Sequence, residues 1–315
     1  MSSLSSFIRT TGSWLRAAPF FLTLLVLVAS PSLAAEELIH GEGLLWKVEV
    51  PGTEVPGTRP SYIFGTIHSA DERVTNLPPA IVRVFDSANS LTVEVAMTEE
   101  VMIEAMRAVA LAPGRDLEGI VGTERFQEIV RLAERYGMGP DQLNRMKPWA
   151  VTVVFSLPPA DVGDPLRSLR VLDFQLQLRA ASQGRSVYSL ETVGEQLSIF
   201  DGMSEADQIA FLDAAMVMNP EIEAFTEELL QKYIRRDLKA IFDMMLEQSA
   251  ATDERLLEAF LDRVLYVRNE RMVTRMQAQL ARGNAFVAVG ALHLPGEQGV
   301  LHLLEQEGYR VLRVY

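Results

Sequence analysis

The chain has 315 residues, of which 48% are hydrophobic and 23% are charged, with 20 Gly and 15 Pro. This globular composition excludes a mainly disordered, collagen-like or low-complexity chain. The 29 basic and 42 acidic residues give a formal net charge of −13. No basic stripe interrupts this acidic balance, so we exclude nucleic acid as a partner and expect no electrostatic attraction to anionic lipid.

The sequence contains no cysteine. This excludes a disulfide framework, a thiolate nucleophile, a cysteine zinc site and a cysteine-ligated iron–sulfur cluster. Any metal ion would have to be bound by histidine, carboxylate, carbonyl or water oxygen. Only four histidines are present: His40, His68, His293 and His302.

The first 34 residues have the pattern of a secretory signal peptide. Arg9 and Arg16 precede an apolar run at 17–30, and Ser32-Leu33-Ala34 provides the small-residue pattern typical of a cleavage site. An uncleaved membrane anchor is the alternative, but the run is shorter than the ~20 residues that a spanning helix needs. We therefore expect a chain exported to the bacterial periplasm, with no stable membrane anchor after cleavage and a single domain at 35–315.

Hydrophobic periodicity predicts short strands among helices along the rest of the chain. The expected strands are at 44–50, 61–65, 90–97, 186–190, 285–290 and 309–315, and a turn-rich connection occupies 51–60. One helix is expected to begin at Pro78–Pro79, a second to include 126–133, and a third to begin near 146–149. Further helices are expected at 172–181, over most of 192–282, and at 296–307. This order predicts an α/β (α+β) fold, in which a small mixed central sheet is flanked by helices and carries a long helical insertion.

Two segments of the sequence share one local pattern. A β-favouring run leads into Gly65-Thr66-Ile67-His68, and a second leads into Gly290-Ala291-Leu292-His293. Glycine would let the backbone leave the sheet sharply, and open α/β sheets bind ligands beyond their strand ends. Two such imidazoles at neighbouring strands could therefore bind one metal ion.

The pattern alone is weak, because Gly299-Val300-Leu301-His302 has the same spacing inside an expected amphipathic helix. His302 and His40 are therefore interpreted as incidental. The alternative for His68 and His293 is that both are packing or capping residues of the core.

Two acidic residues also lie at expected strand ends. Glu94 stands among apolar residues, where an unpaired carboxylate is costly to bury, and Glu191 follows the strand at 186–190. Either could be a metal ligand or a general base; the alternative is a solvated edge strand. No serine-hydrolase elbow, H-E-x-x-H, Walker A or G-x-G-x-x-G pattern is present in the sequence.

Six segments in order resemble the TraB/GumN family: YIFGTIH, the strand with Glu94, MKPW, LDFQLQLRAASQGRSVYSLETVGEQ, the helix with Arg268 and Asn269, and FVAVGALHLPGEQGVLHLLEQEGYRV. The resemblance runs from about Leu44 to Val314. This family is related to the Tiki metalloproteases, which act on Wnt, and more distantly to erythromycin esterase-like and ChaN-like proteins.

The resemblance implies a divalent-metal-dependent hydrolase, with a peptide or another small-to-medium molecule as substrate. It implies His68 and His293 as metal-site residues, with Mn, Co or Zn as the metal, and it matches Glu94, Arg268 and Asn269 to family positions. Glu94 or Glu191 would be a further ligand or the general base. Arg268 would stabilise developing negative charge, and Asn269 would hydrogen-bond to that charge or to the substrate. Wnt does not transfer as a substrate, because Tiki proteins are eukaryotic and membrane-anchored.

A non-catalytic periplasmic protein is the rival interpretation. This binding or regulatory protein would use the same pocket to hold a peptide, a haem-like ligand or a polysaccharide-related ligand. The sequence leaves open the substrate, the metal, the oligomeric state and the role of the helical region at 200–282.

Overall fold

The computed structural model describes residues 38–50, 59–162, 168–248, 258 and 261–315. The expected signal peptide and most of the turn-rich connection at 51–60 lie outside the described residues. The described residues form two compact units. The helical unit consists of Thr98–Arg170 and Gln196–Thr226, and the sheet unit consists of residues 38–97, 171–195 and 227–315. Both units lie within the predicted 35–315 domain, whose extent stays a prediction.

The sheet unit contains a six-stranded mixed sheet in the order β4-β3-β5-β2-β1-β6. The strands are β1 (Leu45–Glu49), β2 (Ser61–Thr66), β3 (Ser90–Val93), β4 (Ser186–Ser189), β5 (Ala285–Gly290) and β6 (Arg310–Arg313). β4, β3, β5 and β2 are mutually parallel, whereas β1 pairs antiparallel with both β2 and β6. The predicted mixed sheet is confirmed.

The parallel half of the sheet determines where side chains can meet. Thr66 of β2 pairs with Gly290 of β5, while Val93 of β3 pairs with Ala288 of β5 and Ser189 of β4. The carboxyl ends of these four strands therefore lie along one edge of the sheet. In open sheets of this kind, that edge is where ligands bind.

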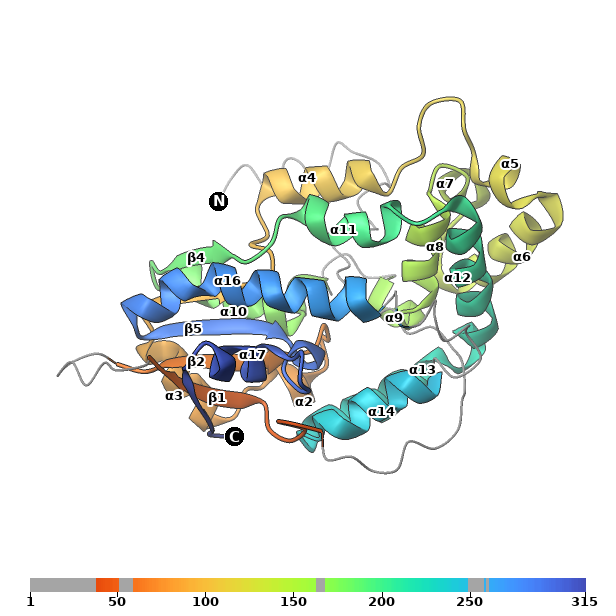
Figure 1. Ribbon diagram of the computed structural model, residues 1–315. Helices are drawn as coiled ribbons and strands as arrows, with labels where there is room; N and C mark the ends of the chain where they lie inside the picture. The colour runs from red at the N-terminus through yellow and green to blue at the C-terminus, as the bar shows by residue number, and fades with distance from the viewer. Residues whose placement is uncertain (1–37, 51–58, 163–167, 249–257, 259–260) are drawn as a thin grey trace. The chain divides into compact units, whose positions relative to one another are not determined.

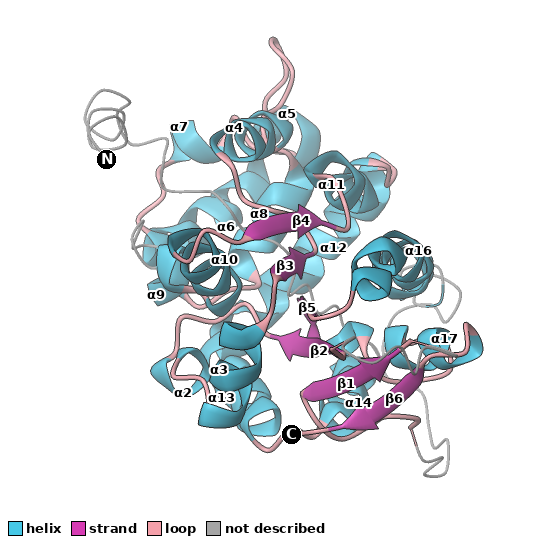
Figure 2. Cartoon of the chain, turned by 90° about the vertical axis from the view of Figure 1, so that its left-hand side faces the viewer, coloured by secondary structure: helices cyan, strands magenta, loops and turns pink. Residues whose placement is uncertain are grey.

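Helices of the sheet unit cover both faces of the sheet. Figure 2 shows α16 (Val267–Arg282) and α17 (Val300–Gln306) on one side, and α3 (Pro79–Ser87) and α10 (Leu172–Ser182) on the other. The unit also contains α2 (Glu72–Thr75), α14 (Leu238–Gln248), the π-helical turn η5 (Asp262–Tyr266) and the short η6 (Ala291–His293). α16 runs along β5 (Figure 1).

The helical unit is built around α8 (Pro148–Phe155), whose sequence PWAVTVVF is almost entirely buried. α8 packs against α12 (Glu205–Met218), and Ser204 caps α12 by accepting from the Asp207 N–H, as predicted. The other helices are α4 (Glu99–Ala108), α5 (Leu117–Val121), α6 (Thr123–Ala133), α7 (Pro140–Leu143), α9 (Pro159–Val162) and the short η2 (Glu134–Tyr136), η3 (Ser168–Arg170) and η4 (Asn219–Glu221). Two more, α11 (Val193–Asp201) and α13 (Ile222–Ile234), contain residues of both units.

Two predicted boundaries are wrong. The strand expected at 90–97 ends at Val93, so Glu94 is the first residue after β3. The helix expected from Gly296 begins only at Val300. Gly296 has a φ of +91°, a backbone conformation that glycine adopts without strain but that a helix does not contain, and Gly299 is extended.

Within the described ranges, we find no helix whose length and apolar character would let it cross a membrane.

Candidate functional site

Four of the predicted site residues lie at the carboxyl ends of the four parallel strands, and the other two, Arg268 and Asn269, lie on α16. His68 follows β2, Glu94 follows β3, Glu191 follows β4, and His293 closes the short helix after β5. All four belong to the sheet unit. The topology thus brings together residues that are up to 225 positions apart (293 minus 68) in the sequence.

The two motif glycines allow close approach rather than an unusual backbone angle. Gly290 has an ordinary φ of −53°, and Gly65 is not among the glycines with positive φ. A Cβ on Gly65 would lie 2.7 Å from Leu294 Cδ1, and one on Gly290 would lie 3.2 Å from Glu94 Oε1. The expected reason for these glycines, a sharp departure of the backbone from the sheet, is therefore replaced by the packing of the strand ends.

We expect Gly65→Ala to destabilise the protein by about 1–3 kcal/mol, because the added methyl overpacks a buried contact. Gly184→Ala is not a fair comparison, since its φ of +69° strains any side chain. Gly139→Ala, where a Cβ would meet nothing within 4 Å and φ is negative, is the matched control. Urea unfolding of the two variants checks this, and equal midpoints would contradict the packing account.

His293 is buried, and its ring orientation is fixed by Asn269 of α16. The His293 Nδ1 atom lies 2.6 Å from the Asn269 Oδ1 atom, while the Asn269 amide nitrogen donates to the Gln298 carbonyl. Since Oδ1 only accepts, Nδ1 carries the proton and Nε2 is the free nitrogen. That nitrogen lies 3.8 Å from Glu94 Oε1. Burial, together with Arg268, lowers the pKa of His293 to about 3 against the opposing effect of Glu94, so this ring is neutral near pH 7.

His68 is held by a carboxylate. The His68 Nδ1 atom lies 2.7 Å from Asp173 Oδ2, so Nδ1 donates and Nε2 is again the nitrogen that this contact leaves free. Burial alone would lower the pKa of His68, but the charge and hydrogen bond of Asp173, helped by Glu94, outweigh it and raise the pKa to about 9. The two imidazoles therefore both have Nδ1 bonded to a side-chain oxygen but differ in charge.

Glu94 connects the strand ends. Its Oε1 accepts from the Gly290 N–H at 2.7 Å, and its Oε2 accepts from Arg268 at 2.6 Å. Burial would raise the pKa of Glu94, but the charges of Arg268, His293 and His68 and the Gly290 hydrogen bond lower it to about 2. Glu94 is thus a carboxylate anion throughout the physiological pH range.

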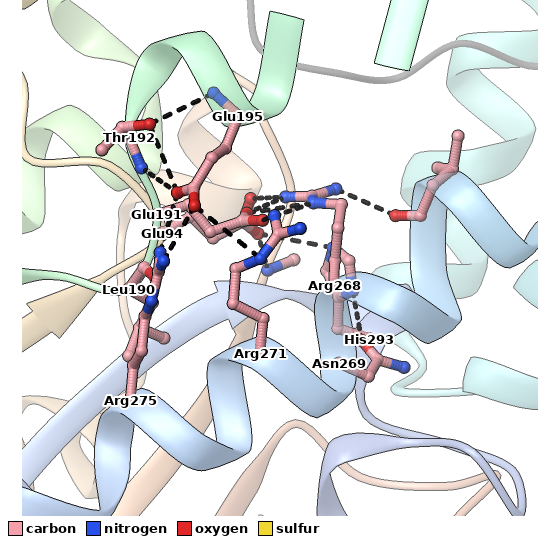
Figure 3. Close-up of polar contacts among 12 residues, drawn as sticks. Glu94, Leu190, Glu191, Thr192, Glu195, Arg268, Asn269, Arg271, Arg275 and His293 are labelled. Carbon is pink, nitrogen blue, oxygen red and sulfur yellow. Dashed lines mark hydrogen bonds and ion pairs between the residues drawn. The ribbon is translucent and has the colours of Figure 1, made fainter. Parts of the chain in front are cut away.

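Arg268 and Glu191 form a buried ion pair beside Glu94 (Figure 3). Arg268 occupies the same i, i+4 row of α16 as the buried Met272, Met276 and Leu280, so its charge is carried into the protein interior. It donates to both Glu191 oxygens at 2.7–3.2 Å and to the Val264 carbonyl of η5 at 3.0 Å. Arg271 adds a fourth hydrogen bond to Glu191, at 3.1 Å.

The segment that carries Glu191 is itself tied to α16. Thr192 and Glu195 form a reciprocal capping box at the start of α11, in which each backbone N–H is bonded by the other residue's side chain. Arg275 donates to the Leu190 carbonyl and to both Glu195 oxygens at 2.7–2.8 Å. Arg268, Arg271 and Arg275, all on one face of α16, thereby hold this loop in place (Figure 3).

We expect Glu195→Gln to lower thermal stability at pH 7 but not near pH 2. Hydrogen bonding from Arg275 lowers the folded-state pKa of Glu195 to about 2, below its unfolded value of about 4.3. Because the folded pKa is depressed, this stabilisation is present above about pH 5 and is lost as the pH falls to about 2. The difference in Tm between wild type and variant should shrink over that window. A gap that stays constant from pH 7 to pH 2.5 would contradict the assignment.

The side chains at these strand ends carry donor atoms of the types that divalent metal ions prefer. Glu94 is a permanent carboxylate, His293 Nε2 is unprotonated, and His68 would have to release its Nε2 proton on binding; imidazole nitrogen and carboxylate oxygen are suitable donor types for Mn, Co or Zn. Glu191 is less suitable, because four hydrogen bonds from arginine occupy its oxygens. As the side chains stand, however, no group of three or more His, Asp and Glu among the described residues could hold a metal ion.

Asp173 was not predicted from the sequence. It lies in the first turn of α10, 105 residues from His68, and the local pattern shows only an acidic residue at a helix start. The other two histidines lie outside the site: His40 contacts Glu305 at 3.0 Å, and His302 of α17 lies 3.4 Å from the same oxygen.

Comparison with known proteins identifies the family of the chain. The family model of the TraB/PrgY/gumN family matches residues 44–313, which include every strand of the sheet. The chain therefore belongs to the TraB/PrgY/gumN family, as the sequence resemblance predicted. No solved structure matches the chain.

Relatives with assigned names include Metalloprotease TIKI2 of Danio rerio, which is 29% identical over 85% of this chain and 60% of its own length. Metalloprotease TIKI1 of Homo sapiens is 26% identical over 80% of this chain and 59% of its own length. The uncharacterized protein YbaP of Shigella flexneri is 23% identical over 79% of this chain and 89% of its own length. The chain spans about three fifths of the length of the Tiki relatives. Homologues named metalloproteases suggest a metal-dependent protease family.

Proposed function

We propose that the protein is an exported divalent-metal-dependent hydrolase that cleaves peptide bonds. Its site is the carboxyl edge of the parallel strands, where His68 and His293 would bind the metal ion through Nε2. The observation that carries this proposal is the matched orientation of the two imidazoles: each has its Nδ1 hydrogen-bonded to a side-chain oxygen, at 2.6 and 2.7 Å. Metal-ligating histidines are oriented in this way.

Glu94 would be the third ligand. Its pKa of about 2 makes it a poor general base near neutral pH, because an efficient base has a pKa near the working pH, but it makes Glu94 a permanent anionic donor. Its Oε1 is already within 3.8 Å of His293 Nε2.

Arg268 would act as a positioning residue rather than contact the substrate. It is only 2% exposed, and its donors are directed to Glu94, Glu191 and a backbone carbonyl. Glu191 would fix Arg268, and Arg268 would then hold Glu94. Asn269 would orient His293, since both polar atoms of its amide are engaged.

A divalent metal ion supplies Lewis acidity for the attack of water on a peptide carbonyl. The relatives named metalloproteases support peptide as the substrate class. The metal would be Mn, Co or Zn, in agreement with a donor set of imidazole nitrogen and carboxylate oxygen.

The test is metal-dependent turnover of a fluorogenic peptide library by purified protein. After chelation, added Mn²⁺, Co²⁺ or Zn²⁺ should restore cleavage of at least one peptide class in wild type but not in His68→Ala or His293→Ala. His302→Ala is the matched control, because His302 has the same G-x-x-H spacing but lies in α17, away from the strand ends. Metal binding without any turnover would instead support a binding or regulatory protein.

Export to the bacterial periplasm belongs to the same proposal and rests on the sequence of the first 34 residues. Expression of the full chain in a bacterium, followed by fractionation and N-terminal sequencing, should yield a periplasmic protein that begins near residue 35. A cytoplasmic protein that keeps its first residues would contradict export.

A further inference from the structure

Asp173 makes one side-chain contact with the last residue of β2 and one with the segment that follows it. Its Oδ2 accepts from His68 Nδ1 at 2.7 Å, and its Oδ1 accepts from Thr66 Oγ1 at 2.5 Å. A carboxylate bound at both oxygens has little rotational freedom. Thr66 therefore fixes the plane of the carboxylate that in turn fixes the His68 ring.

The backbone around Asp173 is fixed as well. The Leu172 N–H donates to the Ser69 carbonyl at 3.0 Å, and Leu172 is 1% exposed. Residues on both sides of His68 thus contact the first turn of α10. The Tyr233 hydroxyl of α13 also donates to the Gly65 carbonyl of β2 at 2.8 Å. The position of Asp173 relative to β2 is determined by these contacts and not by the imidazole alone.

We propose that Asp173 is a positioning residue that acts through His68: its carboxylate holds the ring with Nε2 as the free nitrogen and increases the strength of that nitrogen as a metal ligand. The metal-binding part of this inference rests on the proposed function, whereas the orientation of the His68 ring by Asp173 does not. A carboxylate that accepts from the far nitrogen of a ligating histidine has this effect in metal sites generally. His293 has the neutral amide of Asn269 in the same place, so of the two rings only His68 has a negatively charged partner at Nδ1.

The first arm of the test needs no metal. In proton NMR spectra of the purified, metal-free protein, the Nδ1 proton of His68 should appear far downfield because it is bonded to a carboxylate. Its assignment follows from its loss in His68→Ala. Asp173→Ala should remove the signal, whereas Asp243→Asn, a change at an exposed carboxylate paired with Lys239, should leave it in place. A signal that persists in Asp173→Ala overturns the proposed contact.

The second arm measures Co²⁺ affinity. Asp173→Asn and Asp173→Ala should bind Co²⁺ about 10–100-fold more weakly than wild type and Asp243→Asn. Thr66→Val, which removes the other partner of the carboxylate and leaves His68 in place, should give a smaller loss. It also provides a usable variant if Asp173→Ala does not fold.

The outcomes separate the two proposals. Wild-type affinity in both Asp173 variants, with Co²⁺ bound through His68, overturns the positioning role while the proposed function stands. If wild type itself binds no Co²⁺, the proposed function fails, and the downfield proton alone decides whether Asp173 orients His68.

Discussion

Arg268→Met is expected to lower the free energy of unfolding by about 3–5 kcal/mol. The variant fills a similar volume but leaves Glu191, with a fully buried side chain, without its main partner, and Glu94 without its cation. Removing one member of a buried ion pair carries this cost because the remaining charge is desolvated and uncompensated. Denaturant unfolding of the purified protein measures it.

Arg275→Met provides the control on the same helix face. Arg275 is 40% exposed and pairs with the partly exposed Glu195, so its loss should cost less than about 1 kcal/mol. The double variant Arg268→Met/Glu191→Leu should recover much of the lost stability, since it removes both buried charges. An Arg268→Met protein as stable as Arg275→Met would show that the buried network does not organise this edge of the sheet.

Glu94→Gln is expected to reduce metal-dependent peptide turnover by at least about 100-fold while the protein stays folded. The amide keeps the size of the side chain, and its single oxygen can still accept from either the Gly290 N–H or Arg268, but it lacks the negative charge that a divalent ion requires. Since Arg268 stays paired with Glu191 in this variant, the free energy of unfolding should fall much less than in Arg268→Met. Measurements of kcat/KM at saturating Mn²⁺ or Co²⁺ give the result.

Glu305→Gln is the matched control, because Glu305 also contacts histidines, His40 and His302, but lies on α17. Its turnover should equal that of wild type. If Glu94→Gln keeps wild-type kcat/KM with unchanged metal affinity, Glu94 is not a ligand.

Local patterns predicted the parts of the site that depend on strand ends. Alternating or continuous apolar runs located all six strands, and the two G-x-x-H segments and Glu94 lie at the carboxyl edge because their strands are parallel neighbours. The pairing of Arg268 with Glu191 had no local signal, since an arginine on a helix is ordinarily solvated. Only the buried Met272, Met276 and Leu280, which lie in the same i, i+4 row of α16, show that the Arg268 side chain points inward.

Hydrophobic periodicity could not predict the contacts between segments that are far apart in the sequence. Asp173 reaches His68 because α10 packs beside β3 and β4, a tertiary arrangement that the sequence of α10 does not encode by itself. The late start of α17 has a local cause, the positive φ of Gly296, and residues 296–299 (GEQG) contain no apolar residue that supports the helix expected there.

The central claim is that His68 and His293 bind one shared divalent ion, and the most direct measurement is the stoichiometry and spectrum of bound Co²⁺. Wild type and His302→Ala should each bind one tight ion with absorption bands typical of nitrogen and oxygen ligands. His68→Ala and His293→Ala should each lose that ion and those bands. Identical binding in all four proteins, or the loss of the ion in only one of the two strand-end variants, would contradict a shared site.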